Sequence, residues 1–318
     1  MRKGDDSVQL VEVGPRDGFQ SVGPFIPTAT KIALIERLHA AGVLRMEVTS
    51  FVSPSALPQM ADAAEIVAAT ASLPALDAQV LVPTARHAAR ALEAGARHLS
   101  AVLSVSERHN MGNVRRLPLE SAADYAEMVA MMPRDARMRL NLATSFDCPH
   151  TGRIDGDAVI ALLETLVTAT ADVEIALCDT TGRADPGQVR TLFRRVRERF
   201  PEVRAWAFHG HDTYGLGAAN ALAAFDTGVR TFDAAAAGLG GCPFAPGATG
   251  NVATEDLVWM FDHMNVATGI DLDRLVGAAH AIAELPGAQI GGRVRQALAS
   301  RPCVAASQWL RGNATTGR

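Results

Sequence analysis

The sequence predicts an α/β protein of the (β/α)8 TIM-barrel class with extra C-terminal helices. Eight short runs of strand-forming residues recur along the 318 residues, and a helical pattern separates each pair. No obvious linker divides them, so one closed barrel is favoured over two smaller domains. The strand candidates are residues 8–13, 45–49, 78–82, 98–103, 138–142, 173–177, 204–208 and 231–234.

Glycines end several of the helical patterns. A glycine suits the left-handed backbone position that closes a helix, and a new strand candidate begins within a few residues of each one. The three clearest patterns are residues 32–38 before Gly42, 88–94 before Gly95 and 216–226 before Gly228.

An open doubly wound sheet is the alternative fold. Against it, the first strand candidate is followed by Gly-Pro-Arg-Asp-Gly at residues 14–18, which is not a dinucleotide-binding fingerprint. We therefore expect a catalytic barrel over residues 1–270. Residues 271–318 are expected to form a C-terminal helical extension packed on the barrel, with extra helices from about residue 271 to residue 309.

Composition and charge exclude several classes of protein. Apolar residues make up 48% of the chain, charged residues make up 20%, and the net charge is −4, which argues against disorder and against a dedicated nucleic-acid binder. No apolar run approaches the ~20 residues that a membrane helix needs. The N-terminus does not resemble a signal, and the four cysteines, at 148, 178, 242 and 303, are not paired in spacing. We expect a reduced, cytoplasmic protein.

Unusual polar residues follow the strand candidates at their carboxyl ends, which is where barrel enzymes build their sites. His209 and His211 end the seventh strand candidate, and alternation along a strand turns both to the same face. The others are Arg16 and Asp17 after the first strand, Glu47 and Thr49 at the second, Ser104, Ser106 and Glu107 after the fourth, Asp179 after the sixth, and the loop 238–251 after the eighth.

Two of these residues join the histidines as candidate metal ligands. Asp17, His209, His211 and Asn251 offer two nitrogens and two oxygens without a thiolate, so Mg²⁺ or Mn²⁺ is expected rather than structural zinc. Other interpretations stay open: Asp17 as a turn residue before Gly18, Asn251 as a residue at the start of a helix, or either one as a partner that orients a histidine ring.

Four segments resemble a known family: residues 11–20, 47–54, 209–215 and 238–251. In matching order they resemble the 3-hydroxy-3-methylglutaryl-CoA lyases, members of a metal-dependent barrel family that includes isopropylmalate and homocitrate synthases. The Gly-Leu-Gly-Gly-Cys-Pro run that begins at Gly238 is the most specific piece, because the synthases share the metal motifs but not this run.

The resemblance implies cleavage of a 3-hydroxyacyl-CoA to acetyl-CoA and a keto acid, with acetoacetate as the family-typical product. It implies a divalent metal on Asp17, His209, His211 and Asn251. The implied catalytic residues are Arg16, Glu47, Asp179, His209 and Cys242. Of these, His209 or Asp179 is the expected base. Arg16 is expected to stabilise the enolate oxygen, and Cys242 to return a proton to the enolate carbon. Glu47 has a second interpretation, as a partner that holds Arg16 in place.

Departures from the family pattern leave the acyl group open. Ser21 and Val22 stand where these lyases carry Asn-Glu, and Arg183 follows the sixth strand, where it could meet a different carboxylate.

Three other activities remain: a Claisen-type synthase on the same metal site, a non-catalytic metal-dependent binding protein, and a metallohydrolase that uses Glu47 or Asp179. A homodimer or a higher homo-oligomer is expected, since barrel enzymes commonly dimerise.

Overall fold

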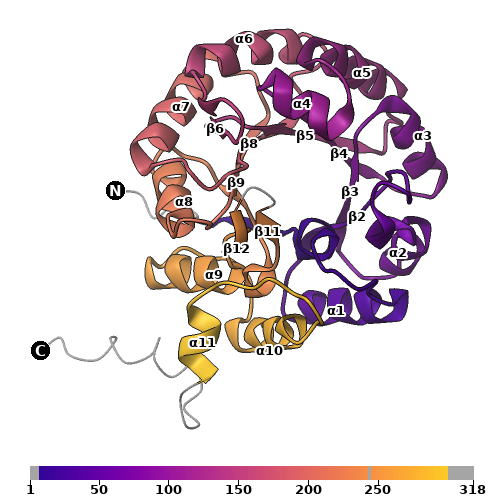
Figure 1. Ribbon diagram of the computed structural model, residues 1–318, viewed down its shortest axis with the longest axis vertical. Coiled ribbons are helices and arrows are strands. Elements are labelled where there is room, and N and C mark those ends of the chain that lie inside the picture. The colour runs from indigo at the N-terminus through magenta and orange to yellow at the C-terminus, as the bar shows by residue number, and fades with distance from the viewer. Residues whose placement is uncertain (1–6, 243–244, 300–318) are drawn as a thin grey trace, which may run out of the picture.

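A closed barrel of eight parallel strands forms the centre of the molecule (Figure 1). The computed structural model describes residues 7–242 and 245–299, with the backbone alone for Cys242 and residues 245–248. The barrel strands are β1 (Gln9–Glu12), β2 (Arg45–Ser50), β3 (Asp77–Val82), β4 (His98–Ser104), β5 (Arg137–Ala143), β8 (Glu174–Asp179), β9 (Ala205–Gly210) and β10 (Thr231–Ala234). The predicted barrel is confirmed, and each predicted strand overlaps one of these eight.

The strands follow chain order around the barrel, and β1 closes it by pairing with both β2 and β10. Every neighbouring pair is parallel, so all the carboxyl ends meet at one rim. The register of β9 and β10 places Asp233 directly beside His209. Residues far apart in the sequence are thereby brought to the same level of the barrel.

Helices surround the barrel as an outer ring (Figure 1). They are α1 (Thr28–Ala40), α2 (Ala63–Thr70), α3 (Ala85–Glu93), α5 (Pro118–Met131), α6 (Gly156–Val167), α7 (Pro186–Arg199), α8 (Gly217–Phe225), α9 (Thr254–His263) and α10 (Leu272–Ala283). Two further helices lie off this ring (Figure 1): α4 (Glu107–Val114) lies inside it, next to β4, and α11 (Val294–Ala299) lies outside it, against α9. Gly42, Gly95 and Gly228 have φ of 93°, 98° and 92°, as the helix-closing role predicts. None of the helices in the described ranges is both long and apolar enough to cross a membrane.

The C-terminal helices complete the ring rather than stand apart from it. Helix α10 packs against α1 and α9, so it lies between the last and the first helices of the barrel (Figure 1). The chain then runs back over the rim and ends its described part in α11. Residues 300–309, where further helix was expected, lie outside the described residues, and the division at residue 270 stays a prediction.

Apolar packing is concentrated between the strands and the helices, where Leu38, Phe193 and Phe261 are fully buried. The barrel interior is different, because several of its inward positions carry buried charged side chains, where bulky branched residues usually fill such barrels; they include Arg139, Glu174 and Asp233. Arg139, 1% exposed, is the largest fully buried side chain. A charged interior beneath the carboxyl rim provides polar partners for residues placed there.

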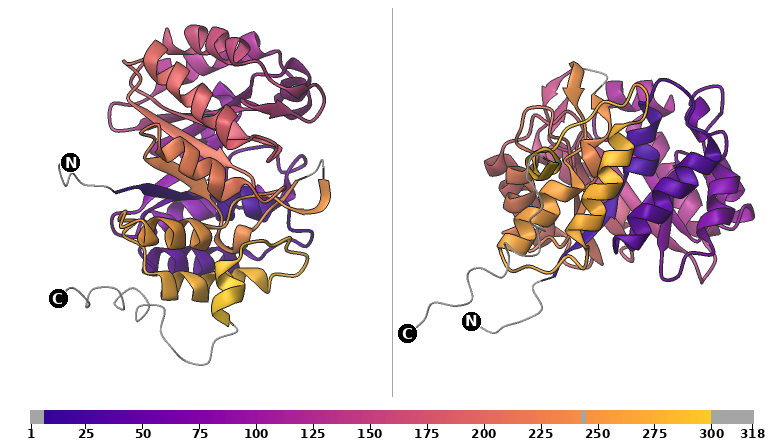
Figure 2. Two further views of the ribbon diagram at one scale, coloured as in Figure 1. Left: turned by 90° about the vertical axis from the view of Figure 1, so that its left-hand side faces the viewer. Right: turned by 90° about the horizontal axis from the view of Figure 1, so that it is seen from below.

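Short irregular elements cover the carboxyl rim. They are the π-helical turn η1 (Gly14–Gly18), the 3-10 turns η2 (Pro58–Met60) and η3 (Ala236–Gly238), and the hairpins β6 (Asp147–Cys148) with β7 (Gly152–Arg153) and β11 (Gly241–Cys242) with β12 (Ala245–Thr249). Figure 2 shows the β11–β12 hairpin projecting from the side of the barrel at which the strands end. The loops on this side carry the predicted site residues.

Candidate active site at the carboxyl rim

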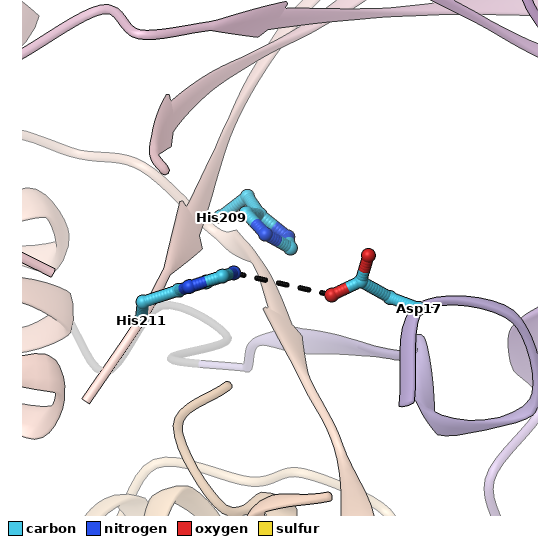
Figure 3. Close-up of side chains that lie close together, drawn as sticks. All are labelled: Asp17, His209 and His211. Atoms are coloured by element: carbon cyan, nitrogen blue, oxygen red, sulfur yellow. Dashed lines mark ion pairs between the residues drawn. The ribbon is translucent and has the colours of Figure 1, made fainter. Parts of the chain in front are cut away.

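Asp17, His209 and His211 meet at the carboxyl rim (Figure 3). Each offers one ligand atom, and these atoms all lie within 4.8 Å of one another. Ligands about 2.1 Å from one Mg²⁺ would lie at most ~4.2 Å apart. The separation of the three atoms is therefore close to what one small divalent cation requires.

Asp17 is placed by the turn that follows β1. The backbone N–H groups of Arg16, Asp17 and Gly18 all point back to the carbonyl of Val13, which makes the turn tight. Gly18 packs closely on Leu239, and a Cβ added there would lie 2.7 Å from the leucine Cδ2. This contact fixes the turn after β1 against the loop after β10. The turn itself is π-helical, a geometry that is frequent at functional sites.

The two histidines come from the end of β9. The strand ends at Gly210, so His211 lies one residue beyond it. His211 instead forms an isolated antiparallel bridge with Asn251. Both rings still face Asp17, and their centroids lie 5.2 Å apart (Figure 3).

Asn251 completes the candidate ligand set. Its Nδ2 donates to Asp17 Oδ2 at 2.8 Å and to the carbonyl of Leu239 at 3.1 Å. Its Oδ1 is buried and has no hydrogen-bond partner in the described part of the chain. A buried acceptor without a donor is costly unless something else binds it. The free oxygen, beside two imidazoles and a carboxylate, fits a divalent cation such as Mg²⁺ or Mn²⁺. The alternative that Asn251 starts a helix does not hold, because α9 begins at Thr254 with Ala253 at its N-cap.

Arg16 lies beside this set and contacts two carboxylates. Its Nε donates to Glu47, and its Nη1 donates to Asp17 Oδ1 at 2.5 Å. The structure therefore contains the contact that is expected if Glu47 holds Arg16 in place. Burial alone would raise the pKa of Asp17, but the charges of Arg16, His209 and His211 hold it well below its usual range. Asp17 is thus ionised at neutral pH, as a carboxylate ligand of a cation would have to be.

The surroundings of the two imidazoles differ. Burial lowers the pKa of His211 to about 4, so its ring is neutral near pH 7. Burial also disfavours the charged form of His209, but a hydrogen bond with Asp233 raises its pKa. The Nδ1 of His209 lies 3.1 Å from Asp233 Oδ2, which leaves Nε2 for the site. A nitrogen that binds a cation cannot also accept a proton, so this geometry favours the ligand role of His209 over the role of base.

Asp179 faces a different environment. Cys178 faces the charged barrel interior, where burial and the neighbouring Asp233 raise the pKa of its thiol. Side chains alternate along a strand, so Asp179, the next residue of β8, points away from the barrel interior. Its two carboxylate oxygens accept from the backbone N–H of Ala184 at 3.3 and 3.2 Å, and burial raises its pKa to about 7. These are the contacts of a residue that caps a turn, and its catalytic role stays a prediction.

Cys242 lies on the backbone of β11, which pairs with β12 above the rim. Its thiol lies outside the described side chains, so its role as a proton donor also stays a prediction. The loop that carries it is held from below: the N–H of Gly240 donates to the carbonyl of Gln289 at 3.1 Å, and the N–H of Gly291 donates to the carbonyl of Ala237 at 2.8 Å. The chain between α10 and α11 therefore supports the base of this loop.

Two buried carboxyl groups fasten the loops that carry Asp17 and Asn251. Glu12 accepts from the N–H of Gly14 at 2.8 Å, from that of Ala236 at 2.9 Å and from the hydroxyl of Thr254 at 2.6 Å. Glu255 accepts from the N–H of Ala237 at 3.0 Å. Burial raises the pKa of Glu12 to about 7 and that of Glu255 to about 8.

These groups predict that the apo protein loses stability as the pH rises. An unfolded chain releases the protons of Glu12, Asp179 and Glu255 near pH 4 to 4.5, whereas the folded chain keeps them to about pH 7 or 8. The folded state binds more protons in between, so the free energy of unfolding falls with pH, by up to about 1.4 kcal/mol per pH unit for each group. The opposing effect of His211, whose pKa is lowered, is complete above about pH 6.5.

We therefore expect the melting temperature in EDTA to fall by several degrees between pH 6.5 and 8, as calorimetry can show. The Glu255→Gln variant keeps an acceptor for Ala237 but has no proton to lose, so its slope should be shallower. A melting temperature that stays flat or rises over this range in the unsubstituted protein contradicts the prediction.

Sequence reasoning missed a buried pair that contacts this site, Arg139 and Asp233. Arg139 Nη2 donates to both oxygens of Asp233 at 2.7 Å, and Asp233 in turn contacts His209. A signal was available: both residues lie inside predicted strands, where a charged side chain is unusual. The strand register that joins them could not be read from the sequence.

Known proteins resemble this chain over most of its length. The family model described as HMGL-like matches residues 7–282. The (R)-citramalyl-CoA lyase of Chloroflexus aurantiacus is 41% identical over 285 residues, which cover 86% of this chain and 89% of that protein. The mitochondrial hydroxymethylglutaryl-CoA lyase of Mus musculus is 38% identical over 291 residues, which cover 91% of this chain and 89% of that protein.

Solved structures agree with this relationship. The structure of an HMG-CoA lyase from Acinetobacter baumannii, in complex with coenzyme A and 3-methylmalate, matches with a TM-score of 0.86 and 38% identity. The match covers 93% of this chain and 97% of that one. Family model, sequence relatives and fold all coincide with the residues that form the barrel and its rim. The chain therefore belongs to the HMGL-like family and is a carbon–carbon lyase of the hydroxymethylglutaryl-CoA lyase type.

Proposed function

We propose that the chain is a divalent-cation-dependent lyase that cleaves 3-hydroxy-3-methylglutaryl-CoA, or a closely related 3-hydroxyacyl-CoA, to acetyl-CoA and a keto acid. The observation that supports this most strongly is the convergence of Asp17, His209 and His211 beside Arg16 at the carboxyl rim. The free Oδ1 of Asn251 adds an acceptor to that set. Mg²⁺ or Mn²⁺ is the proposed cofactor.

The reaction breaks the bond between the thioester's α-carbon and the carbinol carbon. The substrate hydroxyl passes its proton to a base, for which His209 and Asp179 are the candidates, and the carbinol carbon becomes a ketone. The electron pair of the broken bond moves to the thioester fragment as an enolate, which then takes up a proton. When bound, the divalent cation supplies Lewis acidity that lowers the pKa of the substrate hydroxyl. Arg16, fixed by Glu47 and Asp17, is a preorganised cation for the enolate oxygen.

The proton for the enolate carbon is proposed to come from Cys242. A thiol has an ordinary pKa of about 8.5, close enough to neutrality to exchange protons during turnover. The support for this role is the Gly-Leu-Gly-Gly-Cys-Pro run that contains Cys242, together with the position of β11 at the rim. Glu47 is proposed to position Arg16 rather than to transfer a proton.

Citramalyl-CoA is a second candidate substrate, favoured by the 41% identity to a citramalyl-CoA lyase. It lacks one methylene between the carbinol carbon and the free carboxylate, so its keto-acid product is pyruvate instead of acetoacetate. One methylene changes kcat/KM by about 10- to 200-fold in an enzyme pocket. Coenzyme A, present in the structure of the Acinetobacter baumannii enzyme, is the proposed carrier in both cases.

A panel of thioesters tests this proposal. The purified protein is incubated with 3-hydroxy-3-methylglutaryl-CoA or with either stereoisomer of citramalyl-CoA, and mass spectrometry follows acetyl-CoA, acetoacetate and pyruvate. We expect acetyl-CoA and one keto acid in equal amounts, with a preference of at least about tenfold for one substrate. EDTA should abolish turnover, and Mg²⁺ or Mn²⁺ should restore it.

Other products would contradict the proposal. Free coenzyme A from the 3-hydroxyacyl thioesters, without acetyl-CoA, would indicate a metallohydrolase. Release of coenzyme A from acetyl-CoA plus a keto acid, without cleavage of any member of the panel, would indicate a Claisen-type synthase. Turnover that survives EDTA and does not respond to added cation would remove the metal from the mechanism.

A further inference from the structure

A row of buried charges crosses the barrel interior beneath the candidate metal site. Asp233 on β10 contacts Arg139 on β5, and Arg139 Nη1 lies 3.2 Å from Glu174 on β8. Glu174 in turn accepts from Arg45 on β2 at 2.9 and 2.6 Å. None of the four is more than 8% exposed. The row holds two cations and two anions, and at the end away from Asp233 the Nε of Arg45 also lies 3.5 Å from Asp77 Oδ2.

The top of this row is His209. Because Asp233 and His209 are register partners on neighbouring strands, their side chains emerge side by side into the interior. The carboxylate of Asp233 is an acceptor only, so the 3.1 Å contact requires a proton on His209 Nδ1. The other nitrogen, Nε2, is then the one that carries a lone pair.

Arg139 determines how Asp233 lies. Its Nη2 donates to both carboxylate oxygens at 2.7 Å, while its Nε donates to Asn141 Oδ1 at 2.9 Å. The guanidinium group is thereby held at two points, and it holds the carboxylate on the His209 side of the barrel. Asp233, although close to the candidate ligands, remains paired with a buried cation.

His211 has no equivalent arrangement. Its Nδ1 is buried and has no hydrogen-bond partner among the residues described here, while its Nε2 lies 3.9 Å from Asp17 Oδ2. Only one of the two imidazoles is therefore locked in a single tautomer by a buried partner. Any effect of Asp233 on the tautomer of an imidazole is therefore expected at His209 and not at His211.

We propose that Asp233, held by Arg139, is a positioning residue that fixes the Nδ1–H tautomer of His209 and so presents Nε2 to the divalent cation. The inference rests on the proposed metal site. Carboxylate partners of this kind commonly change metal affinity by 10- to 100-fold.

The Asp233→Asn variant tests the inference with almost no change of shape. Arg139 can only donate, so the new side-chain amide must offer it the carbonyl oxygen and turn its NH₂ group toward His209. The ring must then accept at Nδ1 and carry its proton on Nε2, where it blocks the cation. In ¹⁵N-histidine-labelled apo protein above pH 8, two-bond ¹H–¹⁵N correlations should show the Nδ1–H tautomer for the unsubstituted protein and the Nε2–H tautomer for the variant. A His209→Gln variant assigns the signal.

Titration with Mn²⁺, followed by the EPR signal of the free ion, supplies the second readout. We expect D233N to bind Mn²⁺ about 10- to 100-fold more weakly than the unsubstituted protein. The matched control is Asp62→Asn, which also removes one carboxylate from a buried ion pair, because Lys31 Nζ lies 2.9 Å from Asp62 Oδ2. It should leave both the His209 tautomer and the Mn²⁺ affinity unchanged.

A double variant covers the case in which D233N does not fold. Asp233→Leu with Arg139→Met removes one charge of each sign and leaves Arg45 paired with Glu174, so no charge is stranded. His209 should then populate both tautomers and bind Mn²⁺ more weakly. Wild-type tautomer signals and wild-type Mn²⁺ affinity in either folded variant would overturn the inference. Failure of the unsubstituted protein to bind Mn²⁺ would instead refute the proposed metal site, while the apo spectra would still decide the role of Asp233.

Discussion

The Arg16→Gln variant is expected to lose about 10²- to 10³-fold in kcat, the usual effect of removing one preorganised donor from a developing oxyanion. Arg16 is buried, contacts Asp17 at 2.5 Å and is fixed by Glu47, so no other side chain can reproduce its charge at that point. The loss should appear in kcat rather than KM, because the enolate charge exists only after the bond breaks. Steady-state kinetics with the preferred thioester measures it.

The affinity for Mn²⁺ distinguishes the loss of the Arg16 donor from damage to the candidate metal site. Removing a cation beside Asp17 takes away a repulsion toward the divalent ion, so Mn²⁺ should bind to the Arg16→Gln variant at least as tightly as to the unsubstituted protein. Arg16→Lys is the conservative comparison, and it should recover little activity, since lysine lacks the planar fork that contacts two carboxylates at once. A variant that retains full kcat would remove Arg16 from the chemistry.

The Asp17→Asn variant is expected to bind Mn²⁺ at least about 100-fold more weakly and to lose most activity at ordinary cation concentrations. Asp17 supplies the only charged oxygen of the candidate set, and the charge of Arg16 beside it keeps it ionised. Asparagine keeps the shape and can still accept from Asn251, so the change is mainly one of charge. Mn²⁺ titration and kinetics at increasing Mn²⁺ measure the effect, and high cation concentration should restore part of the activity.

Asp212→Asn is a matched control, because Asp212 directly follows the candidate ligand His211 in the chain. The Asp212 carboxylate accepts from the N–H of Gly217 at 2.7 Å and is not part of the ligand cluster. Its amide counterpart can still accept that hydrogen bond, so Mn²⁺ affinity should be unchanged. Equal losses of affinity in the Asp17 and Asp212 variants would show that the loss of any carboxylate near the site, rather than of the Asp17 carboxylate in particular, is responsible.

Local signals in the sequence account for the parts of the fold that were predicted well. Glycines at Gly42, Gly95 and Gly228 mark helix ends because the left-handed backbone there excludes most other residues. The meeting of Asp17 with Asn251, 234 positions apart, was predictable because parallel barrel strands bring all their carboxyl ends to one rim. Chain order and strand direction were sufficient for that result.

Side-chain direction at the strand ends was less predictable. The turn that carries Asp17 is π-helical, and β9 stops one residue before His211; neither follows from the hydrophobic pattern. Asp179 was one of two candidate bases, beside His209. Its carboxylate accepts from the backbone N–H of Ala184, since alternation along β8 places Cys178 inward, and its catalytic role stays a prediction. The pairing of Arg139 with Asp233 depends on the register of strands that are distant in the sequence.

Anomalous scattering from crystals grown with Mn²⁺ can locate the proposed metal site. We expect one strong manganese peak at the carboxyl rim, within coordination distance (about 2.0 to 2.3 Å) of an Asp17 oxygen and one nitrogen from each of His209 and His211, with Asn251 Oδ1 beside it. A manganese peak elsewhere, or no peak at a concentration that supports full turnover, would contradict it.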